Sequence, residues 1–131
     1  MTKQQHGHIK DDDMKEIDSL LSTSKDLKSI IVLHHPPIKL MSQWVDNIGL
    51  INGEEFIQMI KKHLNLKLVL FGHAHQEVCK NIDHIQIYGT PSTCYQFKPK
   101  TEFMEYDNLP PGFRLVKVST NGTITTNVFR I

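Results

Sequence analysis

Four histidines occur in two short clusters, and imidazole is the side chain in this sequence best suited to bind a transition metal. His34 and His35 begin the segment HHPP, and His73 and His75 lie in the segment GHAH. Neutral imidazole nitrogen is a ligand of zinc, manganese, iron and nickel. The two clusters therefore predict a metal site, provided that the fold brings them together.

Both clusters follow short apolar runs that predict buried strands. Residues 29–33 (SIIVL) end at HHPP, and residues 67–71 (KLVLF) end at Gly72. Because two prolines end any regular element, His34 and His35 are expected at the carboxyl end of the first strand. Ligands of parallel α/β sheets bind beyond the carboxyl ends of the strands, where these imidazoles would converge. Gly72 is expected to allow a sharp turn, and an extended His-x-His step would place both rings on one face.

Two amphipathic helices are expected on one face of these strands. Residues 11–24 begin with three aspartates, which suit the positive end of a helix dipole. Asn52 is expected to cap a second helix over residues 53–64. Apolar side chains recur at helical spacing in both segments. The expected inner faces carry Met14, Ile17, Leu20 and Leu21 in the first helix, and Phe56, Ile57, Ile60 and Leu64 in the second.

The C-terminal third of the chain predicts antiparallel strands. Residues 84–89 alternate between apolar and polar side chains. Residues 113–119 and 123–129 are joined through Asn121-Gly122, which is a strong hairpin signal. The predicted fold is therefore α/β, with the order helix, strand, helix, strand, followed by antiparallel strands and a C-terminal hairpin that extends the sheet or starts a second one.

Composition narrows the possible functions. The chain has 131 residues and a formal net charge of +1, which provides no basic surface for nucleic acid. No apolar stretch is long enough to span a membrane, and the N-terminus has no signal-peptide core, so a cytoplasmic protein without a membrane partner is expected. Cys79 and Cys94 are expected to be reduced thiols. His63, which follows two lysines, is expected to be exposed. The remaining histidines outside the two clusters are all expected to be solvated or structural: His6, His8, His63 and His84.

Several segments resemble known enzymes. HHPP followed by GHAH resembles the last two of the five metal motifs of calcineurin-like metallophosphoesterases. Residues 44–52 (WVDNIGLIN), 89–99 (GTPSTCYQFKP) and 109–131 resemble the bacterial 3′,5′-cyclic AMP phosphodiesterases of that superfamily. The resemblance runs along nearly the whole chain, from HGHI at residues 6–9 to Ile131. It implies hydrolysis of a cyclic nucleotide substrate at a centre of two divalent metals (manganese, iron or zinc).

The resemblance also implies roles for the four clustered histidines. His34 and His73 would be ligands of one metal, and His75 would be a ligand of the other. His35 would be the catalytic residue beside them, either supporting the metal ligands from behind or facing the substrate. In the family the two metals are bridged by an aspartate and a hydroxide, which attacks the phosphorus while the metals stabilise the developing charge.

The sequence departs from the family in its first three metal motifs. Asp-x-His, Gly-Asp-x-x-Asp and Gly-Asn-His are all missing. Residues 1–131 are therefore expected to be a single C-terminal portion, half of an α-β-β-α metallophosphoesterase sandwich. Such a chain should bind at most one metal, show negligible activity alone, and form homo-oligomers through its exposed sheet surface. The alternatives are a non-catalytic metal-binding or interaction fragment, and a mononuclear zinc hydrolase using His34, His73 and His75.

Overall fold

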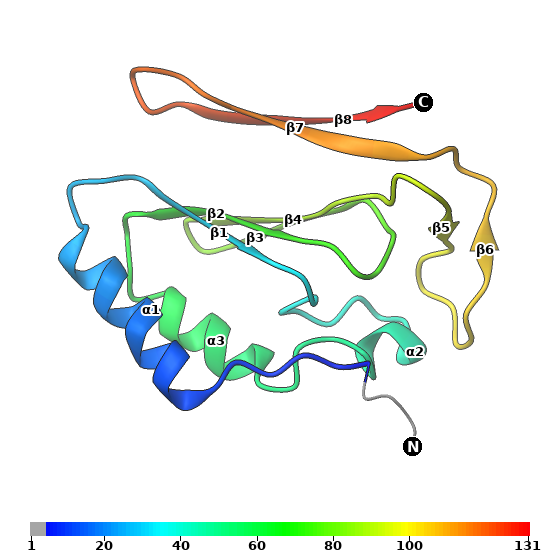
Figure 1. The fold of residues 1–131 in the computed structure, drawn as a ribbon, viewed down its shortest axis with the longest axis horizontal. Coiled ribbons are helices and arrows are strands. Elements are labelled where there is room, and N and C mark those ends of the chain that lie inside the picture. The colour runs from blue at the N-terminus through cyan, green and yellow to red at the C-terminus, as the bar shows by residue number, and fades with distance from the viewer. Residues whose placement is uncertain (1–4) are drawn as a thin grey trace.

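Helices, a mixed sheet and a C-terminal hairpin form three successive layers in the computed structural model, which describes residues 5–131 (Figure 1). Helices α1 (Asp11–Thr23) and α3 (Gly53–Ile60) lie together on one face of the sheet, and the hairpin lies over the other face. Both the α/β class and the two helices on one face agree with the sequence prediction. No described helix is long and apolar enough to cross a membrane.

The central sheet has four strands in the order β1-β2-β4-β3. Strands β1 (Ser29–Leu33) and β2 (Leu66–Phe71) are parallel neighbours, as predicted. The strand predicted at residues 84–89 is β4 (Ile85–Gly89), which has an antiparallel neighbour as expected but also runs parallel to β2, which the prediction did not include. Its antiparallel partner is β3 (Val78–Ile82), an edge strand that the sequence did not reveal. The middle of β3 is exposed and polar, so it lacks the apolar pattern of a strand.

The core lies between the two helices and the sheet. Each side chain removed fully from water stabilises the fold by about 1.5–3 kcal/mol. Two expected core positions are wrong: Leu20 is 59% exposed, and Leu64 is 73% exposed because α3 ends at Ile60. The buried cluster consists of Met14, Leu21, Phe56, Ile57, Met59, Ile60, Leu66, Val69, Phe71, Ile85 and Ile87.

Asn52 precedes α3 as expected, but its side chain makes no capping hydrogen bond. Its amide instead donates to the carbonyl oxygen of Ile9 (2.8 Å) and accepts from the Ile9 backbone N–H (3.1 Å). Because these bonds hold the segment before α1 against the start of α3, Asn52 fixes tertiary structure rather than the helix end.

The C-terminal hairpin forms a separate two-stranded sheet. Strands β7 (Gly112–Val118) and β8 (Ile124–Arg130) are antiparallel. The turn between them contains Gly122, whose φ of 79° is a conformation that glycine adopts without strain. The Arg114 guanidinium donates to the Gly89 carbonyl oxygen (3.0 Å) and lies 4.8 Å from the centre of the Tyr88 ring, so β7 is tied to β4.

The segments between these layers contain three short elements. Helix α2 (Gln43–Asp46) lies in the connection from β1 to α3. Strands β5 (Gln96–Phe97) and β6 (Tyr106–Asp107) pair in the segment before the hairpin. Cys79 and Cys94 are both free and exposed, which agrees with the expected thiols.

Candidate metal centre

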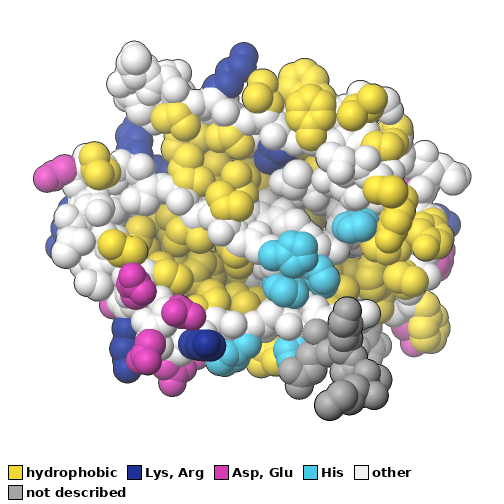
Figure 2. All heavy atoms as spheres, in the orientation of Figure 1, with side chains coloured by type: hydrophobic (Ala, Val, Ile, Leu, Met, Phe, Trp, Pro, Cys, Tyr) yellow, Lys and Arg dark blue, Asp and Glu magenta, His cyan; other side chains and the backbone are white. Residues whose placement is uncertain are grey.

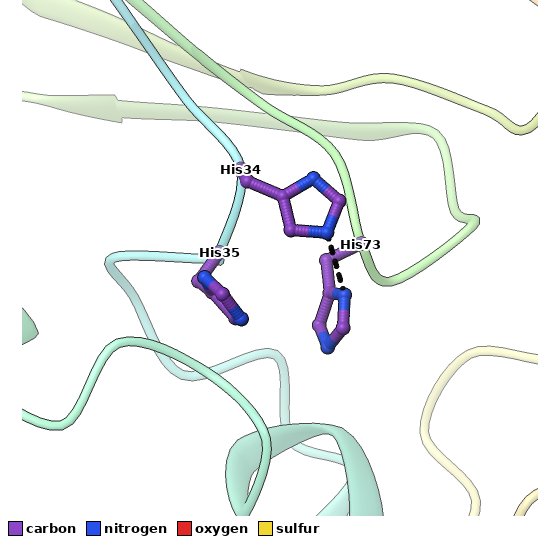
Figure 3. Close-up of side chains that lie close together, drawn as sticks. All are labelled: His34, His35 and His73. Atoms are coloured by element: carbon purple, nitrogen blue, oxygen red, sulfur yellow. Dashed lines mark hydrogen bonds between the residues drawn. The ribbon is translucent and has the colours of Figure 1, made fainter. Parts of the chain in front are cut away.

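Three imidazoles converge at the carboxyl ends of β1 and β2. His34, His35 and His73 each offer one nitrogen, and these nitrogens lie within 4.8 Å of one another. His34 Nε2 is 2.9 Å from His73 Nδ1 (Figure 3). The rings of His35 and His73 have centroids 4.5 Å apart. The convergence follows from the parallel pairing, because the carboxyl ends of adjacent parallel strands meet at one edge of the sheet.

The turn after β2 differs from the expected geometry. Gly72 has no positive φ, whereas His73 (φ 61°) and His75 (φ 49°) adopt the left-handed conformation. The expectation of an extended His-x-His step with a sharp turn at Gly72 is therefore wrong. Left-handed residues other than glycine are uncommon and cluster at functional sites, although histidine tolerates the conformation better than most residues. Two of the three histidines that the resemblance makes metal ligands therefore carry backbone strain.

His75 lies outside the group of three imidazoles. Its Nδ1 is 3.0 Å from the carbonyl oxygen of Tyr95, and its ring stacks against Phe97 at a centroid distance of 5.1 Å. Because a carbonyl oxygen only accepts hydrogen bonds, Nδ1 is the donor and Nε2 keeps its lone pair. An imidazole whose other nitrogen donates to a carbonyl oxygen is the usual arrangement of a metal-ligating histidine. A compact histidine cluster and a separate histidine beside hydrophobic side chains are visible on this face (Figure 2).

The N-terminal segment forms one wall of the histidine group. The Gln5 carbonyl oxygen is 3.1 Å from His35 Nε2, and a Cβ added at Gly7 would lie 2.5 Å from His35 Nδ1. Gly7 also bonds through its backbone to Gly49 (3.0 Å) and Ile51 (2.8 Å). Glycine at position 7 is therefore required by the close approach of the ring, a role that the sequence did not reveal.

Burial and mutual repulsion favour the neutral form of two of these rings. The pKa of His35 is lowered by burial first and by the neighbouring His34 next. The pKa of His73 is lowered by burial, then by His35 and His34. Neutral imidazole is the form that binds metal, so both rings are ready for coordination near neutral pH.

The donor set fits one transition-metal ion. His73 Nε2 is buried without a hydrogen-bond partner in residues 5–131. Zinc–nitrogen bonds of 2.0–2.1 Å place tetrahedral ligand atoms about 3.3 Å apart, so small ring rotations would close the group around an ion. The described group contains three imidazoles and no carboxylate. It therefore lacks the bridging oxygen ligand that a pair of ions needs.

His63 was expected to be solvated or structural, and its position just after α3 favoured an exposed side chain. The expectation of exposure is wrong. The residue is only 7% exposed, and its Nε2 is 2.6 Å from Asp18 Oδ1 on α1. His84 Nε2 donates to the His63 carbonyl oxygen at 2.8 Å. Both histidines are structural, since they join α1, the end of α3 and the turn between β3 and β4.

Comparison with known proteins shows what this chain is similar to. No family model matches it. A 3′,5′-cyclic-nucleotide phosphodiesterase of Nostoc is 36% identical over 126 residues, covering 96% of this chain and 47% of the relative. The cyclic AMP phosphodiesterases CpdA of Vibrio vulnificus (36% over 128 residues) and Escherichia coli K12 (31% over 126 residues) each match 96% of this chain and 46% of their own length.

A solved structure supports the fold. A dimetal phosphatase from Danio rerio has a TM-score of 0.52 and 17% identity, covering 63% of this chain and 27% of that chain. This likeness shows that the chain shares the fold of the dimetal phosphatase over the matched part. In sequence, the chain is similar to bacterial proteins named cyclic nucleotide phosphodiesterases, and it spans about half the length of the curated relatives that it matches.

Proposed function

We propose that this chain supplies part of a two-metal centre that hydrolyses the phosphodiester bond of a 3′,5′-cyclic nucleotide, with cyclic AMP as the substrate. The observation that carries the proposal is the convergence of His34, His35 and His73 at two parallel strand ends. The chain in which they converge is similar over 96% of its length to enzymes named for this reaction.

The proposed roles follow from where each ring lies. His34 and His73 hold one divalent ion, since their facing nitrogens are already 2.9 Å apart. His75 offers Nε2 to a second ion, because Nδ1 is fixed by the Tyr95 carbonyl oxygen. His35 stands beside both rings and faces the substrate. Manganese, iron or zinc bound there would act as a Lewis acid on a phosphoryl oxygen and activate water.

Residues 1–131 act in this proposal as a C-terminal portion of the enzyme that provides only part of the donor set. Two-metal phosphoesterase centres hold their ions about 3.5–4 Å apart through shared ligands. The described histidine group has no carboxylate to share. The chain alone should therefore bind at most one ion and hydrolyse cyclic AMP negligibly.

The absence of a carboxylate from the described group favours a second candidate, a non-catalytic metal-binding fragment. The mononuclear zinc hydrolase is less favoured, because His75 lies away from His34 and His73.

We also propose that the chain self-associates through apolar sheet surface, where Val32 is 73% exposed on the open edge strand β1. The cytoplasmic location remains a prediction.

Metal analysis together with hydrolysis assays tests the proposal. Zinc, nickel and manganese would be titrated into the chain, His73→Ala and the control His8→Ala, an exposed histidine outside the group. We expect up to one ion per chain, loss of binding in His73→Ala, and unchanged binding in the control. Hydrolysis of cyclic AMP and of a chromogenic phosphodiester in manganese should stay at background. Turnover that disappears in His73→Ala would contradict the inactive-chain proposal, and absence of any bound metal would contradict the metal roles.

A further inference from the structure

We propose that Tyr95 is the residue on which the purine base of the nucleotide stacks, so that it determines preference for a nucleotide over a sugar phosphate. The inference rests on the proposed function for the phosphate end of the ligand. It adds a specificity residue at the base end, on the segment between β4 and β5.

Tyr95 is coupled directly to the candidate metal centre. Its carbonyl oxygen accepts the hydrogen bond from His75 Nδ1 (3.0 Å), and its ring centroid lies 5.1 Å from that of His75. A ligand whose phosphate is held near His75 therefore has Tyr95 as an adjacent aromatic surface. In a nucleotide only one ribose separates the phosphate from the base, so the two ends of the ligand match the two neighbouring side chains.

The Tyr95 ring is held in place by other aromatic rings. It meets Phe97 (5.4 Å, 77°) and Tyr106 (5.3 Å, 80°) in near-perpendicular contacts. Phe97 is buried and packs against Trp44, whose indole N–H donates to Thr101 Oγ1 at 3.1 Å. A ring fixed in this way loses little conformational entropy when a ligand binds to it.

The same residue remains partly open to solvent. Tyr95 is 44% exposed and Tyr106 is 63% exposed, although both belong to a packed aromatic cluster. Any nucleobase can stack on an aromatic side chain, and loss of one such contact weakens binding by about fivefold to 150-fold. An exposed, preorganised ring beside a candidate phosphate site therefore fits a nucleobase better than it fits a purely structural role.

Direct binding to the intact chain tests this assignment. Adenosine, which carries no phosphate and needs no metal, would be titrated and followed by NMR at the backbone amide of residue 95, which every variant retains, with ribose as the reference. AMP and ribose 5-phosphate would be titrated with zinc present. Tyr95→Leu removes the aromatic surface and Tyr95→Phe keeps it. Phe103→Leu is the matched control, because Phe103 is 72% exposed in the same region and makes no ring contact in the described chain.

We expect saturable adenosine shifts at Tyr95 and AMP binding about tenfold tighter than ribose 5-phosphate binding. Tyr95→Leu should remove both effects without changing zinc affinity, whereas Tyr95→Phe and Phe103→Leu should retain them. Unchanged adenosine and AMP binding in Tyr95→Leu would overturn the inference. Equal binding of adenosine and ribose by the unmodified chain would also overturn it. Chemical shifts at residue 95 that change with protein concentration but not with adenosine concentration would overturn it as well. If zinc fails to bind but adenosine shifts persist, the metal roles fail and the base-stacking role stands.

Discussion

Replacement of Gly53 by alanine should weaken the contact that positions the His34–His35 turn. Gly53 is the first residue of α3, and an added Cβ would lie 2.5 Å from the Pro37 carbonyl oxygen and 3.0 Å from the Pro37 carbonyl carbon. Both atoms belong to the backbone, so no side-chain rotation can relieve the overlap. The start of α3 and the end of the HHPP segment must therefore move apart.

The size of the effect follows from two opposing contributions. Overpacking a close contact costs about 1–3 kcal/mol. Alanine also restricts the unfolded chain relative to glycine, which offsets about 0.4–1 kcal/mol. We expect Gly53→Ala to lower the free energy of unfolding by about 1–2 kcal/mol, which lowers the melting temperature by roughly 4–8 °C for a chain of this size.

Gly72→Ala provides the matched control. Gly72 lies in the GHAH segment, but it has no positive φ, and an added Cβ would meet its nearest neighbour at 3.8 Å, an ordinary contact. Its unfolding free energy should stay within about 0.5 kcal/mol of the parent value. Urea unfolding followed by Trp44 fluorescence and circular dichroism measures both variants. A Gly53→Ala chain as stable as the parent, or an equal loss in Gly72→Ala, would refute the reasoning.

Three further predictions concern stability and assembly. His63→Ala should lower the unfolding free energy by about 1.5–3 kcal/mol in urea titrations, because it removes the hydrogen bond to Asp18 from a buried position. Leu64→Ala, at an exposed position, is the control and should leave the unfolding free energy nearly unchanged. The lowered pKa values of His35 and His73 mean that the native chain binds fewer protons than the unfolded chain below the ordinary histidine value of 6.5. Without metal, the contribution of these two histidines to the unfolding free energy should be fully present above their ordinary pKa and be lost as the pH falls through their lowered pKa values. Equal urea midpoints at about pH 8 and about pH 5.5 would contradict this expectation. Val32→Ser should reduce self-association measured by light scattering, since Val32 is 73% exposed on the edge strand β1. A parent chain that is monomeric at high concentration would refute the proposed association.

The sequence by itself determined the elements whose patterns are local. The apolar runs ending at HHPP and GHAH predicted two parallel strands, and parallel pairing alone brings His34 near His73. The acidic start of α1 and the Asn121-Gly122 turn likewise predicted a helix and a hairpin that the structure contains. Helix periodicity, strand runs and turn residues act over short stretches, so they are readable without the fold.

Only the tertiary structure decided how the individual side chains are used. His35 joins the imidazole group because Gly7, distant in sequence, packs against its ring, and His75 leaves it because its Nδ1 bonds to the Tyr95 carbonyl oxygen. His63 is buried because Asp18 on another helix accepts its hydrogen bond. The orientation and burial of a side chain depend on contacts between segments far apart in the chain, which no local pattern contains.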